Sequence, residues 1–145
     1  MRLHRTLVFE ARGKWDHETG GVANLGAYDV YFDTPREFNG KGGSPCPDQL
    51  FLASLSGCVI TTFNYFKKLH GADPKDVEAY VSGRVERGKE GYRLSSIYIK
   101  LTVVSSLEGL EVNKMCAKKA LQYCHLTKSI EPAIPIETSF EVVVG

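Results

Sequence analysis

The chain has 145 residues, of which 43% are hydrophobic and 24% are charged, and its formal net charge at pH 7 is +1. This length suits one domain with a buried core, and we expect residues 1–145 to form that domain. A charge balance so close to neutral gives no electrostatic footprint for nucleic acid or for an acidic membrane surface. We therefore expect neither nucleic acid nor a membrane among the partners.

No segment has the pattern of a signal peptide or of a membrane span. The first twelve residues contain no uninterrupted apolar stretch. Residues 49–66 are uncharged but include several polar residues, whereas a span needs roughly 20 predominantly apolar ones. We expect a cytosolic protein, in which the four cysteines are buried, catalytic or metal-binding rather than paired in structural disulfides.

The N-terminal third of the chain predicts two strands and a loop. Residues 3–11 alternate between apolar and polar types, and residues 27–33 repeat this period of two. Gly20 and Gly21 between them indicate a turn. Residues 35–47 are rich in proline, glycine and asparagine, which is typical of a loop.

One long helix follows this loop. It is predicted to begin at Pro47 or Asp48, because proline suits the first turn and an acidic residue suits the positive end of the helix dipole. It ends at His70, before Gly71. Its first half is apolar on nearly every side, so we expect that half to be deeply buried.

The rest of the chain predicts three strands and a second helix. Apolar residues alternate over 77–85 and again over 97–103, and the turn residues between them favour an antiparallel hairpin. A helix over 107–123 and a strand over 136–144 complete the order ββαββαβ. This order predicts an α+β fold, with a mostly antiparallel sheet and helices packed on one face.

Cys58 and Cys124 form a candidate redox pair. Cys58 lies in the first half of the long helix beside small residues, and Cys124 ends the second helix. This placement favours two thiols that meet in the fold. No Cys-x-x-Cys spacing is present, which argues against thioredoxin-like and zinc-ribbon sites. A composite zinc site of Cys58, Cys124 and His125 stays open as an alternative.

Neither cysteine is activated by its own helix. Cys58 lies well beyond the first turn, where the effect of the helix dipole has faded, and burial alone makes a thiol inert. A reactive Cys58 therefore needs a cation from elsewhere, for which Arg36 is the first candidate and Lys41 the second. The negative end of a helix disfavours a thiolate at Cys124, which suits a resolving thiol better than a first nucleophile.

The segment Pro47-Asp48-Gln49-Leu50, followed by small and apolar residues up to Gly57-Cys58, resembles the Pro-Glu-Glu-Leu…Cys helix of the OsmC/Ohr family. These are osmotically inducible and organic-hydroperoxide-resistance proteins. The second cysteine before the final strand and the ββαββαβ order are similar too, so the resemblance covers nearly the whole chain. It implies an intertwined α+β homodimer with active sites at the subunit interface and with no metal or haem.

The resemblance also implies an activity and roles for individual residues. The activity is reduction of organic hydroperoxides and hydrogen peroxide, with Cys58 as the peroxidatic and Cys124 as the resolving cysteine, regenerated by an external dithiol. Arg36 is the nearest match to the family's loop arginine. Gln49 stands where the family has a glutamate, and it brings no charge with which to orient the arginine. His125 stands where family members often have proline.

A candidate apolar wall for an organic hydroperoxide consists of Phe51, Leu55 and Phe63, with Tyr123 as a candidate extension. Core packing accounts for each of these residues equally well. Two rival functions remain open. The same fold could be a non-enzymatic module that binds a small apolar ligand or senses redox state, with peroxidase activity weakened by Gln49. It could also be a structural domain with inert thiols. His125 is compatible with a solvated turn or with tuning of Cys124.

Overall fold

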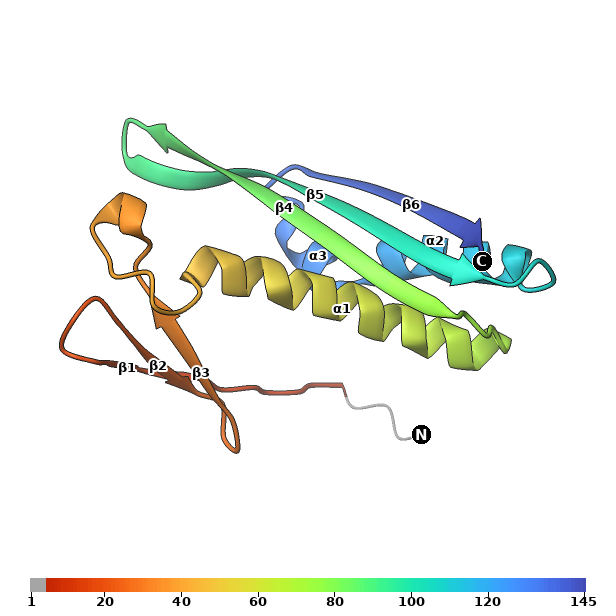
Figure 1. The fold of residues 1–145 in the computed structure, drawn as a ribbon, viewed down its shortest axis with the longest axis horizontal. Coiled ribbons are helices and arrows are strands. Elements are labelled where there is room, and N and C mark those ends of the chain that lie inside the picture. The colour runs from red at the N-terminus through yellow and green to blue at the C-terminus, as the bar shows by residue number, and fades with distance from the viewer. Residues whose placement is uncertain (1–4) are drawn as a thin grey trace. The chain divides into compact units, whose positions relative to one another are not determined.

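The computed structural model describes residues 5–145 and divides into two compact units, the first ending at Leu50 and the second covering Phe51–Gly145 (Figure 1). Its mixed content of strands and helices confirms the α+β class. In chain order the elements are β1 (Arg12–Trp15), β2 (Gly20–Asn24), β3 (Asp29–Asp33), the 3-10 helix η1 (Arg36–Phe38), α1 (Pro47–His70), β4 (Asp76–Gly88), β5 (Gly91–Ser105), α2 (Leu110–Tyr123), α3 (His125–Ile130) and β6 (Ile136–Val144).

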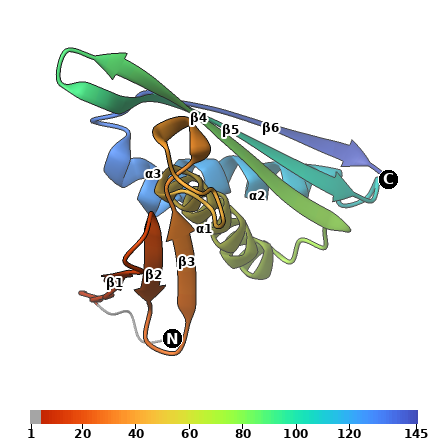
Figure 2. The same ribbon diagram turned by 60° about the vertical axis from the view of Figure 1, so that its left-hand side comes forward.

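The first unit contains an antiparallel sheet in the order β1-β2-β3 (Figure 2). The strand β2 was not predicted, because Gly20 and Gly21 were interpreted as a turn. Both glycines instead lie inside the sheet, where the neighbouring backbone comes very close. A Cβ at Gly20 would lie 2.2 Å from the carbonyl oxygen of Phe32, and one at Gly21 equally close to that of Lys14. Close backbone approach therefore explains this glycine pair.

The strand predicted over residues 3–11 is wrong in position. Regular pairing starts at Arg12, residues 5–11 form no strand, and residues 1–4 lie outside the described part of the chain. Leu7, Val8 and Phe9 are 64%, 81% and 88% exposed. An alternating pattern becomes a strand only where its backbone groups find a partner, and this segment pairs with no strand in the described part of a single chain.

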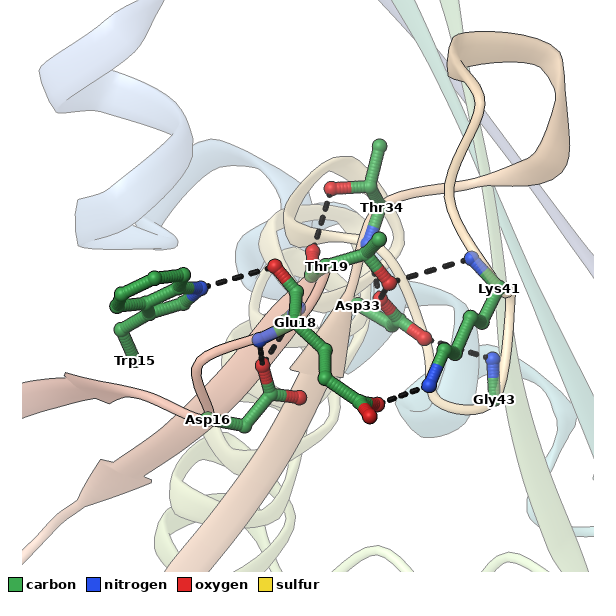
Figure 3. A network of polar contacts seen from close by, with 9 residues as sticks. Trp15, Asp16, Glu18, Thr19, Asp33, Thr34, Lys41 and Gly43 are labelled. Atoms are coloured by element: carbon green, nitrogen blue, oxygen red, sulfur yellow. Dashed lines mark hydrogen bonds and ion pairs between the residues drawn. The ribbon is translucent and has the colours of Figure 1, made fainter.

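A polar network attaches the β1–β2 turn and the loop before α1 to the end of β3 (Figure 3). The Asp33 carboxylate accepts a hydrogen bond from the Thr19 hydroxyl at 2.5 Å. It also accepts the backbone N–H groups of Thr34 at 2.8 Å and Gly43 at 3.0 Å. These bonds, the one from Thr19 foremost, hold the pKa of Asp33 below its ordinary value.

The second unit packs its helices on one face of the sheet β4-β5-β6 (Figure 1). The predicted hairpin is confirmed, with β4 antiparallel to β5 and Val81 opposite Ile99. The closing strand is confirmed at the predicted bounds, and it pairs parallel to β5, with Thr138 opposite Ile99. A parallel pair needs a crossover connection, which α2 and α3 provide.

The core of the second unit follows the inward face of the central strand β5. From Ile97 to Ser105 every second residue of this strand is buried, as expected for a strand with one covered face. Helices α1 and α2 cover this face with large and small apolar side chains respectively. The buried hydrophobic residues are Leu55, Cys58, Val59, Phe63, Phe66, Ala72, Ile97, Ile99, Leu101, Val103, Cys116, Ala117, Ala120 and Cys124.

A β-bulge interrupts the inward face predicted for residues 77–85. The register shifts between Arg84 and Val85, so that Arg84 lies opposite Ser96 whereas Val85 lies opposite Leu94. The extra residue is Ser95 of β5, and it shifts the alternation of the strand that carries it. Val85, beside the bulge, is 40% exposed, whereas the earlier residues of the predicted face, from Val77 to Gly83, are half-buried.

Helix α1 has the predicted bounds, but only one side of it is buried. The expectation that its first half is buried all round is therefore wrong for a single copy of the chain. The opposite side bears small and polar residues together with one isoleucine. The exposed residues along this side are Ala53, Ser54, Gly57, Ile60, Thr61 and Asn64. Within residues 5–145, no helix is long and apolar enough to cross a membrane.

The predicted second helix ends where expected, but the short helix α3 follows it at once. Cys124 joins the two helices, with an extended backbone at φ −60° and ψ 109°. Its N–H donates to the Ala120 carbonyl at the end of α2, and its carbonyl accepts the Lys128 N–H in the first turn of α3. Cys124 is thus both the last cap of one helix and the first cap of the next.

Candidate active site

Cys58 and Cys124 lie together in the core of the second unit. Cys58 is on the buried side of α1 and is 8% exposed, whereas Cys124 at the α2–α3 junction is fully buried. Both are free thiols, and they are close enough for Cys58 to influence the pKa of Cys124. The prediction that these two cysteines meet in the fold is confirmed.

Cys124 is held in its thiol form. Burial raises the pKa of this thiol above its ordinary value of 9.0. The Thr127 hydroxyl donates to the Cys124 sulfur at 3.2 Å and works in the opposite direction, while the neighbouring Cys58 raises the pKa again. A protonated, buried sulfur cannot act first as a nucleophile, but it is suited to react with an oxidised neighbour.

His125 is the second side chain next to Cys58. Its Nδ1 lies 3.7 Å from the Cys58 sulfur, within reach of a hydrogen bond that involves sulfur. The imidazole comes from the first residue of α3 and is exposed. The sequence left His125 as a turn residue or a neighbour that tunes Cys124, whereas the structure brings it to Cys58. This contact depends on α3, which the sequence pattern did not reveal.

The other two cysteines have different surroundings. Cys116 is fully buried on α2, and burial raises the pKa of its thiol. Such a thiol is inert, so Cys116 serves as a small core residue. Cys46 is partly exposed in the loop before α1. Of these two cysteines, Cys46 is therefore accessible to solvent, whereas Cys116 is not.

Gln49 supports the start of α1. Its Oε1 accepts the backbone N–H of Cys46, the residue before the helix, at 3.0 Å. A glutamine at the third helical position that reaches back in this way forms one half of a capping box. The side-chain oxygen of Gln49, which we expected to interact with Arg36, is thus engaged in capping α1.

Arg36 lies on η1, and its Nε donates to the Lys41 carbonyl at 3.3 Å. The guanidinium is exposed and shares a surface pocket of the first unit with Gln49 and Cys46. Arg36 and Gln49 thus line one pocket, and their catalytic roles stay predictions.

Lys41, the second candidate cation, is engaged elsewhere in the first unit. Its Nζ forms an ion pair with the Glu18 carboxylate (Figure 3). This hydrogen bond raises the pKa of Lys41 above its ordinary value. The ammonium group is thus bound to a carboxylate of the same network that holds the loop to β3.

The residues of the candidate apolar wall differ in how much of their surface is buried. Leu55 and Phe63 are core residues with almost no exposed surface, while Phe51 is half-buried and packs against the core. Tyr123 is exposed, with its ring centroid 5.6 Å from that of Phe66. A substrate-binding role for Phe51, Leu55 and Phe63 stays a prediction.

The alternative zinc site gains no support from the side-chain positions. Cys58, Cys124 and His125 are neighbours, but in the described chain from residue 5 onward no group of three or more His, Cys, Asp or Glu residues is placed to hold a metal ion. The arrangement is instead a pair of thiols with one imidazole beside it.

A family model described as OsmC-like protein matches residues 40–139. The chain belongs to the OsmC-like family. This OsmC-like protein is 32% identical to an uncharacterized protein of Acinetobacter baylyi over 147 aligned positions, which cover 94% of each chain. The resemblance inferred from the helix motif and the second cysteine is thereby confirmed.

Solved structures share the fold of this OsmC-like protein. An organic hydroperoxide resistance protein from Elizabethkingia anophelis superposes with a TM-score of 0.74 at 16% identity, over 98% of this chain and 100% of the other. An organic hydroperoxide resistance protein OsmC from Legionella pneumophila gives a TM-score of 0.71 at 17% identity, over 97% and 100%. At these identities the likeness establishes the α+β fold.

Proposed function

We propose that this OsmC-like protein is a thiol-dependent peroxidase that reduces organic hydroperoxides, and hydrogen peroxide as well, in defence against oxidative stress. The observation that carries the proposal is the contact between two free thiols, Cys58 and Cys124, in one core. The family supports it, because solved structures of similar fold are of organic hydroperoxide resistance proteins. The reducing cytosol, where thiols stay free, suits such a reaction.

The proposed reaction uses the two cysteines in turn. The Cys58 thiolate attacks the distal peroxide oxygen, the O–O bond breaks, and an alcohol (or water, from hydrogen peroxide) leaves while Cys58 becomes a sulfenic acid. The Cys124 thiol then attacks the sulfenic sulfur, and water leaves as the disulfide forms. An external dithiol reduces this disulfide and restores both thiols. The raised pKa of Cys124 supports its assignment as the second thiol.

Arg36 is the residue we propose to hold the peroxide and the developing negative charge, with Lys41 as the second candidate. The family resemblance supports Arg36, and the ion pair of Lys41 with Glu18 weighs against Lys41. Gln49 replaces the family's glutamate and cannot orient the arginine by charge. We therefore expect peroxidase activity that is weaker than a carboxylate at this position would give.

The apolar surroundings of Cys58 favour an organic hydroperoxide over hydrogen peroxide in this proposal. Phe51 retains exposed surface with which to contact a substrate, while Leu55 and Phe63 behind it exclude water. Water exclusion strengthens the electrostatic interactions on which the reaction depends.

We also propose that two copies of the chain form a homodimer with an active site at each interface. Two exposed features support this assembly. The residues Leu7, Val8 and Phe9 expose apolar side chains on a segment without a strand partner among residues 5–145 of its own chain. One side of α1 is bare along much of its length, although the helix is mostly apolar.

The test is the consumption of cumene hydroperoxide in the presence of a dithiol by wild type, Cys58→Ser and Cys46→Ser. Wild type and Cys46→Ser should consume the peroxide at similar rates, because Cys46 lies outside the thiol pair. Cys58→Ser should fall to the rate of the dithiol alone. Equal rates for Cys58→Ser and wild type would refute the assignment.

A non-enzymatic redox sensor on the same fold is the second candidate. It is favoured by Gln49, whose acceptor atom caps α1 and which carries no charge. A sensor would form the Cys58–Cys124 disulfide with peroxide but would not turn over many equivalents. Peroxide consumption that stops after one equivalent per chain, with dithiol still present, would select this alternative.

A further inference from the structure

We propose that His125 is the base that activates Cys58, so that the reactive thiol of this chain works as a cysteine–histidine pair. The carrying observation is the 3.7 Å distance between the Cys58 sulfur and His125 Nδ1. The two residues lie on different helices and are 67 positions apart in the sequence. This inference rests on the proposed function for the peroxide step alone, because the state of the Cys58 thiol can be measured without any peroxide.

Cys58 needs such a partner because nothing on its own helix makes its sulfur reactive. It lies far beyond the first turn of α1, where the helix dipole acts. The hydroxyls of Thr61 and Thr62 donate to the Cys58 backbone carbonyl, and so they do not stabilise a negative sulfur. A histidine beside a cysteine is an established means of generating a thiolate near neutral pH.

Among the described residues, two titratable groups contact the Cys58 side chain, and they differ in what they can do. Cys124 is itself a thiol with a raised pKa, and it receives a hydrogen bond from Thr127. It cannot take a proton from Cys58. Lys128, the charged residue of α3, lies over the Tyr123 ring at 5.7 Å from its centroid. The imidazole of His125 is therefore the group beside Cys58 that can accept its proton.

The surroundings of His125 suit a group that both accepts and returns a proton. Its side chain is exposed, so the imidazole can exchange protons with solvent. With the ring proton on Nε2, the Nδ1 atom has a free lone pair directed to the thiol. Position 125 directly follows Cys124, so one short segment delivers both the resolving thiol and the base to Cys58.

Protons and electrons balance in the attack of Cys58 on the peroxide. The Cys58 S–H proton passes to His125 Nδ1 and leaves a thiolate beside an imidazolium. The thiolate sulfur uses one electron pair to form a bond to the distal peroxide oxygen. The O–O bond breaks, and its electron pair leaves with the alkoxide. The alkoxide that leaves takes the proton from His125 and departs as an alcohol, so the imidazole is neutral again.

The direct test is the rate at which iodoacetamide alkylates each cysteine of the reduced full-length protein, measured by peptide mass spectrometry between pH 5 and pH 9. His125→Asn should slow the alkylation of Cys58 at pH 7 by about tenfold or more, and should move its pH profile to higher pH. Cys46, in the same sample, serves as an internal standard. His17→Asn is the matched control, because it also removes one exposed imidazole.

An unchanged Cys58 rate in a folded His125→Asn variant would overturn the proposal, and so would a wild-type Cys58 that reacts more slowly than Cys46. Cys116 reports on folding in the same samples, since this fully buried thiol is labelled only when the core opens. A variant in which Cys116 reacts is unfolded and is replaced by His125→Gln.

A second measurement needs no change at His125. In nuclear magnetic resonance spectra of the reduced protein, replacing Cys58 by serine should shift the His125 imidazole signals and leave those of His17 in place, because only His125 Nδ1 has the Cys58 sulfur as a partner. His125 signals that are identical in wild type and Cys58→Ser would contradict the pair.

The outcomes separate this inference from the proposed function. Slow alkylation in His125→Asn together with no peroxide turnover by wild type would keep the cysteine–histidine pair and reject the peroxidase. Normal alkylation in His125→Asn together with peroxide turnover by wild type would do the reverse.

Discussion

Cys58 and His125 illustrate what sequence spacing can and cannot reveal about a site. Cys58 could be selected from the sequence because it sits among small residues on a well-marked helix, and its meeting with Cys124 was favoured by the placement of the two cysteines and by the family resemblance. The approach of His125 could not be predicted, because it depends on a turn at Cys124 and a helix of six residues. Helices this short carry too few periodic positions for a pattern to stand out.

Gln49 also has a role that the sequence did not reveal, and it rests on one hydrogen bond. From the sequence it was a neutral replacement for a catalytic glutamate. In the structure its Oε1 accepts the N–H of Cys46 and caps α1. A glutamate can make the same capping bond, so the position combines helix capping with its proposed catalytic part. Sequence reasoning considered one of these roles and missed the other.

Asp33 gives a pH-dependent prediction. Its folded-state pKa lies below the ordinary value of 3.8, first because of the Thr19 hydroxyl and next because of the Gly43 N–H. The ionised carboxylate therefore contributes stability that is fully present above the unfolded-state pKa and is lost as the pH falls through the folded-state pKa. Asp33→Asn should lower the melting temperature at pH 7, and the difference from wild type should shrink toward pH 3.

The exposed control Glu10→Gln should leave the melting temperature close to that of wild type at both pH values. A difference between wild type and Asp33→Asn that stays constant from pH 7 to pH 3 would show that the carboxylate bonds in Figure 3 do not contribute as described.

At the scale of elements, the parts with long and regular patterns were predicted well. Helix α1, the β4–β5 hairpin and β6 all have strong periodicity or clear end signals. The failures were β2, in which glycines admit a neighbouring backbone, and the bulge after Arg84. In both cases the deciding interaction comes from another strand, so the local sequence holds no signal for it.

The buried side of α1 can be tested with one substitution at two positions. Leu55 is 1% exposed, whereas Leu69 on the same helix is 61% exposed. Leu55→Ala should lower the free energy of unfolding by about 2–5 kcal/mol, as expected for a cavity in a packed core. Leu69→Ala should change it by less than about 0.5 kcal/mol. Urea denaturation measures both values.

Similar losses for the two variants would contradict the assignment of Leu55 to the core. A small loss for Leu55→Ala, accompanied by a lower rate with cumene hydroperoxide, would instead make Leu55 mainly part of the substrate wall.

At the scale of the whole molecule, association of two chains would explain the bare side of α1 and the exposed N-terminal segment. Sedimentation of the wild-type protein should give twice the mass of one chain. Ile60→Asp places a charge on the exposed side of α1 and should shift the protein toward the monomer, since an unpaired charge is costly in an interface. Gln122→Asp, at an exposed position of α2, is the matched control and should remain a dimer.

A wild-type protein that sediments as a monomer at micromolar concentration would reject the proposed homodimer. A dimer unaffected by Ile60→Asp would place the interface away from this side of α1.

The central claim is that Cys58 and Cys124 act as one redox pair, and a single oxidation tests it most directly. One equivalent of cumene hydroperoxide is added to the fully reduced protein without dithiol, and the cysteine peptides are mapped by mass spectrometry. The account predicts a Cys58–Cys124 disulfide, with Cys46 and Cys116 still free. Two unmodified thiols at Cys58 and Cys124, or a disulfide that joins either of them to Cys46 or Cys116, would contradict it.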